Sequence, residues 1–155
     1  KSFNVTGARI SFLVGRADVI AAVKKLRSQI DFGMFLPLQY AAIAALNGPL
    51  DSVKQQCGLY QQRRDALCGG LRGIGWPVND SHGSMFVWAP IPAGYKNSLD
   101  FCMALMEKSG VICTPGSSFG PLGEGYVRFA LVMPPEKIAE AVQAIAQSGV
   151  LTPNA

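Results

Sequence analysis

Beyond residue 75 the sequence falls into short segments of strand and helix character, and their order limits the fold more than any other feature. Strand patterns cover Met85 to Ile91, Val111 to Thr114 and Tyr126 to Met133, and helix patterns cover Ser98 to Lys108 and Pro135 to Gln147. Ser98 suits an N-cap, and proline is favoured in the first turn of a helix. Three strands and two helices predict a compact layered α/β unit.

The segments before residue 75 favour helices. A strand is predicted from Arg9 to Val14, after which apolar residues recur at helical spacing and form one stripe. A second helix, from about Leu38 to Leu46, has no polar face, which predicts burial on several sides. A third helix begins near Asp51 and is expected to stop near Gly69. The residues of the apolar stripe are Val19, Val23, Leu26 and Ile30.

Composition excludes several classes of function. Of the 155 residues 49% are hydrophobic and only 15% are charged, against about a quarter charged in typical domains. This surplus predicts an obligate oligomer or a piece of a larger protein. The net charge of +4 is scattered, so nucleic-acid binding is not expected. No apolar run is long enough for a membrane span.

The cysteines and the histidine do not form a recognisable site. Four cysteines, Cys57, Cys68, Cys102 and Cys113, lack CxxC spacing, and reduced, mostly buried thiols are expected. The one histidine, His82, lies in a Ser-His-Gly turn and predicts a loop residue. No metal site is therefore expected.

The chain begins with a lysine and an arginine whose chemistry suits a cofactor site. The segment reads Lys1-Ser-Phe-Asn-Val-Thr-Gly-Ala-Arg9. A lysine amine condenses with aldehydes and, once displaced, can move a proton as general base and acid. The arginine guanidinium stays charged and matches phosphate oxygens in a bidentate way. A solvated chain end is the alternative interpretation of this segment.

A second candidate is Arg128, which lies among apolar neighbours in Val127-Arg128-Phe-Ala-Leu-Val132. Arginine is rarely buried unless it is paired. Its side chain either faces solvent from an alternating strand or binds a carboxylate. Upstream lies the loop Thr114-Pro-Gly-Ser-Ser-Phe-Gly120 with a glycine-rich connector. Gly83 and Ser84, before the first of the predicted strands, are possible residues of a cleft edge.

The two motifs together resemble the class I/II aminotransferases, which use pyridoxal 5'-phosphate (PLP). The first motif resembles the family's cofactor-lysine segment, although Ser11 stands where glycine or alanine is usual, and the Pro-Gly-x-x-Phe-Gly loop with its arginine strand resembles the family's ending. The resemblance implies that Lys1 is catalytic and holds the cofactor covalently. It implies that Arg9 binds the cofactor phosphate and that Arg128 binds the substrate α-carboxylate. The fold implied is α/β, the C-terminal part of a PLP-dependent transferase fold.

The resemblance also implies an organisation and a set of partners. Residues 1–50 would end the large cofactor domain, 51–72 would form a connecting helix, and 73–155 would form a small domain with a three-stranded sheet. Amino acid and 2-keto acid substrates, a cytoplasmic location and a homodimer with composite active sites are expected. In such a dimer the segment Asp31 to Phe35 would reach the partner's site, and Met34, Phe35 and Tyr40 would pack at the interface.

Three functions stay open at this point. The first is an aminotransferase, possibly for aspartate, diaminopimelate or similar amino acids. The second is a PLP-dependent carbon-sulfur lyase, and the third is a non-catalytic ligand-sensing domain of a transcription regulator. Other cofactor contacts of the family normally precede the lysine, so the 155-residue chain alone is expected to be inactive.

Overall fold

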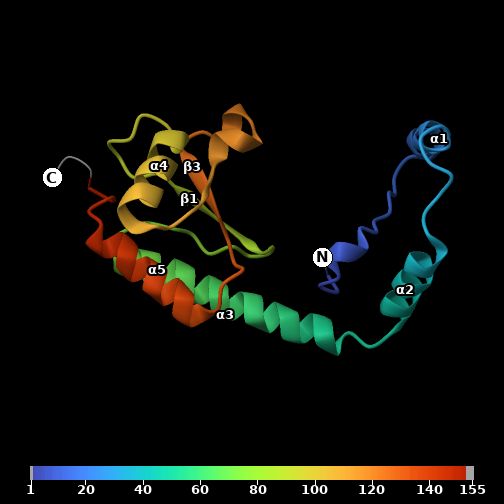
Figure 1. The fold of residues 1–155 in the computed structure, drawn as a ribbon, viewed down its shortest axis with the longest axis horizontal. Helices are drawn as coiled ribbons and strands as arrows, with labels where there is room; N and C mark the ends of the chain where they lie inside the picture. The colour runs from blue at the N-terminus through green and yellow to red at the C-terminus, as the bar shows by residue number, and fades with distance from the viewer. Residues whose placement is uncertain (1, 153–155) are drawn as a thin grey trace. The chain divides into compact units, whose positions relative to one another are not determined.

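A computed structural model describes residues 2–152 of the chain (Figure 1). The chain forms two compact units, of which one ends at Gln56 and the other begins at Cys57. Each unit is described by itself below. The elements in chain order are η1 (Thr6–Ala8), α1 (Ala17–Arg27), α2 (Leu36–Asn47), α3 (Asp51–Gly73), β1 (Phe86–Pro90), α4 (Ser98–Ser109), β2 (Thr114–Pro115), η2 (Gly116–Phe119), η3 (Pro121–Gly123), β3 (Tyr126–Ala130) and α5 (Pro135–Gln147).

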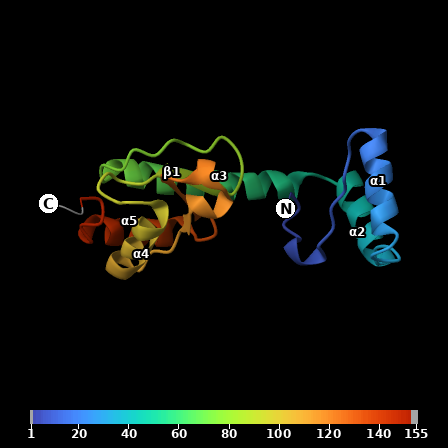
Figure 2. The same cartoon turned by 90° about the horizontal axis from the view of Figure 1, so that it is seen from above.

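The first unit holds η1, α1, α2 and the first turns of α3 (Figure 2). The strand predicted at Arg9 to Val14 is wrong: these residues pair with no other strand within the part of the chain that is described. A strand needs a neighbour for its backbone hydrogen bonds, and this unit supplies none. The predicted burial of α2 is likewise not met, because no residue of α2 is buried.

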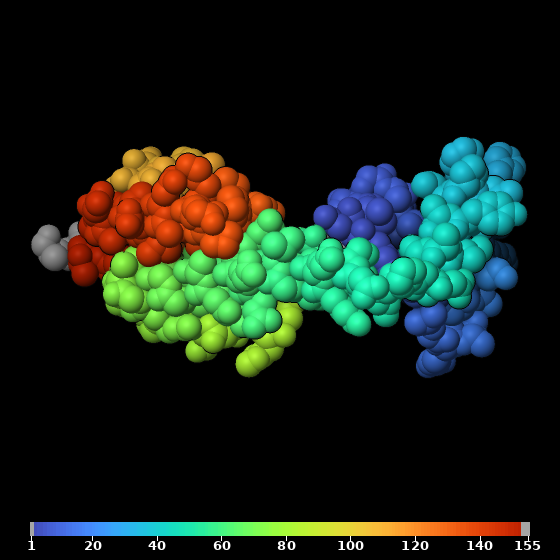
Figure 3. Space-filling model, turned by 90° about the horizontal axis from the view of Figure 1, so that it is seen from below, coloured from blue at the N-terminus to red at the C-terminus, as the bar shows by residue number. Residues whose placement is uncertain are grey.

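The second unit is built around a three-stranded antiparallel sheet with the strand order β1-β3-β2. Side chains alternate along β1 and β3, so that Val87, Ala89, Val127 and Phe129 point into the core. Helices α3, α4 and α5 supply most of the other core residues, and Trp76, Val78, Leu131 and Val150 come from the segments that follow α3, β3 and α5. Figure 3 shows side chains of α5 packed against those of α3.

Trp76 lies at the centre of this core and is only 2% exposed. Its indole ring meets Phe101 edge-on at a centroid distance of 5.3 Å and Phe129 at 5.8 Å. Its Nε1 donates a hydrogen bond to the carbonyl of Pro90 at 2.7 Å, so the buried polar group is satisfied. Trp76 therefore joins the segment after α3 to the end of β1.

The structure corrects the predicted cap of α4. Asn97, and not Ser98, is the N-cap, because its side-chain oxygen accepts a hydrogen bond from the backbone N–H of Asp100 at 2.8 Å. Ser98 is fully buried, and its hydroxyl lies near Glu124 and Ser117. The Ser98 hydroxyl, which the local sequence pattern predicts to cap the helix, thus binds residues that are distant in the sequence.

The end of α3 and the position of β2 also differ from the sequence predictions. Helix α3 continues past Gly69 and Gly70 to Gly73, whereas β2 covers Thr114–Pro115 rather than residues 111–114. A Cβ atom at Gly70 would lie 3.0 Å from Val142 of α5. The glycine therefore permits close packing of two helices rather than ending one. The predicted helix from Pro135 to Gln147 is confirmed at both ends.

The four cysteines are free within residues 2–152. Cys68 and Cys102 are buried, but Cys57 is exposed. The Sγ atoms of Cys102 and Cys113 lie 3.3 Å apart, and burial raises the pKa of the Cys113 thiol. No group of three metal-ligating side chains occurs among the residues described, and none of their helices combines the length and apolar character of a membrane span.

Candidate functional site

Arg128 lies in the middle of the central strand β3. Its backbone neighbours are Trp88 on β1 and Thr114 on β2. Because strand residues alternate, the arginine shares the sheet face opposite the core with Phe86, Trp88, Pro90 and Tyr126. We call this surface the open face.

Two phenyl rings lie against the guanidinium of Arg128. Its Cζ lies 4.1 Å from the ring centroid of Phe86 and 4.4 Å from that of Phe119. Both distances fall within the range of cation–π attraction. Nε is buried and has no hydrogen-bond partner within residues 2–152, and no carboxylate of that range pairs with the arginine. A charged fork of this kind suits an anionic ligand.

A groove of about 510 Å³ crosses the open face. Its volume lies in the range of sites for small molecules. The lining combines aromatic side chains and Arg128 with a polar wall, which consists of Asn79, Asp80 and Ser81. It also includes Ser84, which was predicted as a possible residue of a cleft edge. The lining residues are Pro77, Asn79, Asp80, Ser81, Ser84, Phe86, Trp88, Pro90, Tyr126 and Arg128.

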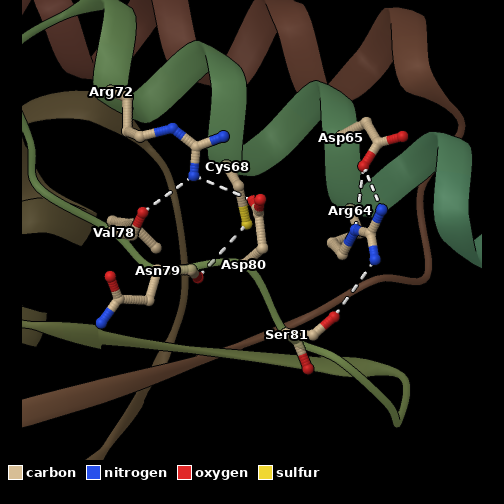
Figure 4. Close-up of polar contacts among 8 residues, drawn as sticks. All are labelled: Arg64, Asp65, Cys68, Arg72, Val78, Asn79, Asp80 and Ser81. Carbon is tan, nitrogen blue, oxygen red and sulfur yellow. Dashed lines mark hydrogen bonds and ion pairs between the residues drawn. The ribbon is translucent and has the colours of Figure 1, made fainter.

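The polar wall of the groove is attached to α3 by side-chain hydrogen bonds (Figure 4). Arg72 donates to the Val78 carbonyl and to the Asp80 carboxylate, both at 2.9 Å. Arg64 donates to the Ser81 carbonyl at 3.4 Å. The hydrogen bond from Arg72 lowers the pKa of Asp80, so this carboxyl stays charged at neutral pH. The groove therefore carries both an anion and a cation.

The loop that brings Phe119 to Arg128 is closed by two glycines. A Cβ atom at Gly116 would lie 1.9 Å from the carbonyl oxygen of Gly123, and one at Gly123 would lie 2.1 Å from that of Gly116. Only glycine tolerates this approach. The two 3₁₀ turns η2 and η3 can therefore touch, with Phe119 between the two glycines in sequence.

Glu124 ties the same loop to the start of α4. Its Oε1 accepts hydrogen bonds from the backbone N–H of Ser98 at 2.6 Å and of Gly125 at 2.8 Å. Its Oε2 lies 3.1 Å from the Ser98 hydroxyl, which also accepts from the N–H of Ser117 at 3.3 Å. The hydrogen bond from Gly125, followed by that from Ser98, lowers the pKa of Glu124. We call this set of contacts the Glu124 latch.

The Glu124→Gln variant tests the latch through the pH dependence of stability. A carboxylate whose folded pKa is depressed stabilises the fold above its unfolded pKa of about 4.3, and this contribution is lost as pH falls through the folded value. The wild type should therefore be more stable than the variant at pH 7, with a gap that narrows as pH falls below about 4.3. Urea unfolding from pH 7 to pH 3 measures it. A gap that is constant with pH would contradict the latch.

Arg9 lies in the first unit and not on the predicted strand. It follows η1 with left-handed backbone angles, φ 50° and ψ 37°. The residue is exposed and borders a hollow of about 460 Å³ between residues 2–12 and α2. Ser2, Thr6 and Ser11 add hydroxyl groups to this hollow. Lys1, the predicted catalytic residue, lies outside the described residues.

Arg128 was predicted from the sequence as a site residue, but the side chains that pack against its guanidinium were not. Phe119 was noted only as part of the Pro-Gly-x-x-Phe-Gly motif, and Phe86 only as part of a predicted strand. The signal available was the alternation of β1, which places Phe86 on the face away from the core. Nothing in the sequence pairs Glu124 with Ser98, 26 residues earlier. His82 is an exposed loop residue, as predicted.

Comparison with known proteins places the chain in a family. A family model described as aminotransferase class I and II matches residues 1–145. LL-diaminopimelate aminotransferase of Halothermothrix orenii is 43% identical over 150 residues, which are 97% of this chain and 38% of that protein. The enzyme of the same name from Dehalococcoides mccartyi strain 195 is 43% identical over 146 residues, 94% of this chain and 37% of that protein.

Solved structures agree with the fold. Substrate-bound BacF from Bacillus subtilis matches with a TM-score of 0.88 at 34% identity, over 95% of this chain and 38% of that one. The aromatic aminotransferase from Pyrococcus horikoshii matches with a TM-score of 0.90 at 27% identity, over 96% and 40%. The predicted fold class and the predicted family are both confirmed, and the chain spans about 38% of the length of the relatives it matches. This chain belongs to the class I and II aminotransferases.

Proposed function

We propose that the full-length protein is a PLP-dependent aminotransferase that moves an amino group between an amino acid and a 2-keto acid. The observation that carries this proposal is Arg128, whose charged fork lies in a groove without a carboxylate partner among the described residues. Amino acids and 2-keto acids share the one group that such a fork binds, an α-carboxylate. The curated relatives favour LL-diaminopimelate as the first amino donor to test.

The residues present fit the phosphate end of PLP, on which class I and II aminotransferases generally depend. Arg9 is exposed, it has no ion-pair partner within residues 2–152, and it borders a hollow lined with three hydroxyl side chains. Guanidinium and hydroxyl groups are suitable donors for phosphate oxygens. In this proposal Lys1 holds the cofactor covalently and Arg9 binds its phosphate. Bound PLP supplies an electron sink for the substrate α-carbon.

In this proposal, residues of the chain bind the substrate and transfer its proton. Arg128 grips the substrate carboxylate and so fixes how the α-hydrogen is presented. The amine of Lys1 would take that α-proton as a general base and give it back as a general acid. The rings of Phe86 and Phe119 lie against the guanidinium and shield part of it from water, which strengthens its attraction to a carboxylate.

The organisation expected from the sequence is part of the proposal. Residues 1–50 would complete the large cofactor domain, 51–72 would connect, and 73–155 would form the small domain. A homodimer is supported by the exposed side chains of Phe35, which ends the segment Asp31 to Phe35, and of Tyr40. Because other cofactor contacts would lie in the rest of the full-length protein, the 155-residue chain alone is proposed to be inactive. A cytoplasmic location stays a prediction.

Borohydride reduction tests the function directly. The full-length protein, loaded with PLP and reduced, should gain one pyridoxyl group, and peptide mapping should place it on Lys1 with none in a Lys1→Ala variant. The unreduced protein should then transfer nitrogen from LL-diaminopimelate to 2-oxoglutarate. A label without any transfer to keto acids would favour the lyase, and no label at Lys1 would overturn the proposal.

A further inference from the structure

We propose that Phe119 is a positioning residue that, together with Phe86, holds the Arg128 guanidinium so that only its edge meets the substrate carboxylate. We further propose that Glu124 acts on this arginine through Phe119. Both statements rest on the proposed function, since they concern how Arg128 binds its ligand. They add residues that assist the arginine without touching the substrate.

The first argument is the geometry around the guanidinium. The Cζ atom of Arg128 lies 4.1 Å from the ring centroid of Phe86 and 4.4 Å from that of Phe119. The buried Nε shows that the inner part of the group is shielded as well. With two rings packed against the group, we infer that a ligand meets it along its N–H edge, which is the direction in which a carboxylate forms two parallel hydrogen bonds.

The second argument is that Phe119 is itself held. Trp88 meets its ring edge-on at a centroid distance of 5.7 Å, and Trp88 in turn stacks on Tyr126 at 5.7 Å. Phe119 is nevertheless 49% exposed, so its position comes from its loop rather than from burial. This is typical of a residue whose packing serves a neighbour and not the core.

The third argument is the anchoring of the loop. The Glu124 latch joins the loop to α4, and the contact of Gly116 with Gly123 brings its two turns together. No ion pair with a described residue competes for Glu124. A break in the latch should therefore free the ring of Phe119, and through it loosen Arg128, while the core of the unit keeps its packing.

The test is a comparison of variants in the full-length PLP-loaded protein. Phe119→Leu should raise the KM of the amino donor about fivefold while kcat stays within about twofold, because one cation–π contact is lost. Phe119→Tyr keeps a ring and should restore the wild-type KM. Phe86→Leu removes the opposite ring and should act like Phe119→Leu, which provides a second route if one variant folds poorly.

Two further measurements separate positioning from general damage. An amine with the same carbon chain as the donor but with no carboxylate group should react equally well with the wild type and with Phe119→Leu. Glu124→Ala should raise the KM of the donor in the wild type but add little in the Phe119→Leu background, because residues that act through one another are not additive.

The possible failures are distinguishable. If the wild type binds PLP but transfers no amino group, the proposed function fails, and the positioning role that rests on it fails with it. If the wild type is active and Phe119→Leu leaves KM unchanged, or slows the amine as much as the amino acid, the positioning role is wrong. If the effects of Glu124→Ala and Phe119→Leu simply add, the latch does not act through Phe119.

Discussion

The Arg128→Lys variant of the full-length protein should lose about 100-fold in kcat/KM for its amino acid donor, mainly through KM. Lysine keeps the charge but not the planar fork, and its ammonium cannot form two parallel hydrogen bonds to one carboxylate. It also cannot fill the space between the rings of Phe86 and Phe119 in the same way. Steady-state kinetics with the amino donor and with the keto acid should show the loss for both.

A matched control for this variant is Arg63→Lys. Arg63 belongs to the same unit, lies over the ring of Tyr60 at 5.5 Å and donates to the Leu131 carbonyl, but it does not line the groove. Its replacement should leave kcat/KM within about twofold, as expected for a residue without substrate contact. PLP labelling should be the same in both variants. Equal kinetic losses in the two variants would show that Arg128 matters for folding rather than for the carboxylate.

The Trp76→Ala variant should destabilise the second unit by about 3–5 kcal/mol, the usual cost of truncating a buried aromatic residue. The side chain is 2% exposed and contacts Phe101 and Phe129 edge-on. Its removal also leaves the Pro90 carbonyl without the indole donor. Amide hydrogen exchange of β1 and β3 in the full-length protein measures this local loss without assuming that the whole protein unfolds in one step.

Trp88→Ala is the control for this effect. Trp88 is also an aromatic residue of the second unit, but it lies on the open face and is 39% exposed. The cost of truncation depends on burial and on the cavity left behind, so Trp88→Ala should cost well under half as much. If both variants lower the protection of β1 equally, Trp76 is not the centre of the core.

Local sequence pattern predicted the elements that depend on nearby residues. Helix α5 was predicted at both ends because proline starts it and its apolar stripe has helical spacing. The local pattern gave wrong predictions where contacts with residues distant in the sequence determine the structure. The Ser98 hydroxyl is bound to Glu124 and Ser117, and Asn97 caps the helix instead. Helix α3 runs through Gly69 and Gly70, and α5 packs against Gly70. The strand predicted from Arg9 failed for the same reason, since pairing needs a partner strand.

The candidate site divides along the same line. The sequence by itself indicated the candidate site residues: Lys1 and Arg9 in a segment that resembles the family's cofactor-lysine motif, and Arg128 as a charge within an apolar strand. Their roles stay predictions. Only the tertiary structure decided how Arg128 is held, since its two rings come from β1 and from a loop between β2 and β3. A sequence pattern can indicate a candidate charged residue because the chemistry of a side chain depends on its residue type. The direction in which that group points depends on packing between segments far apart in the chain, which no local pattern records.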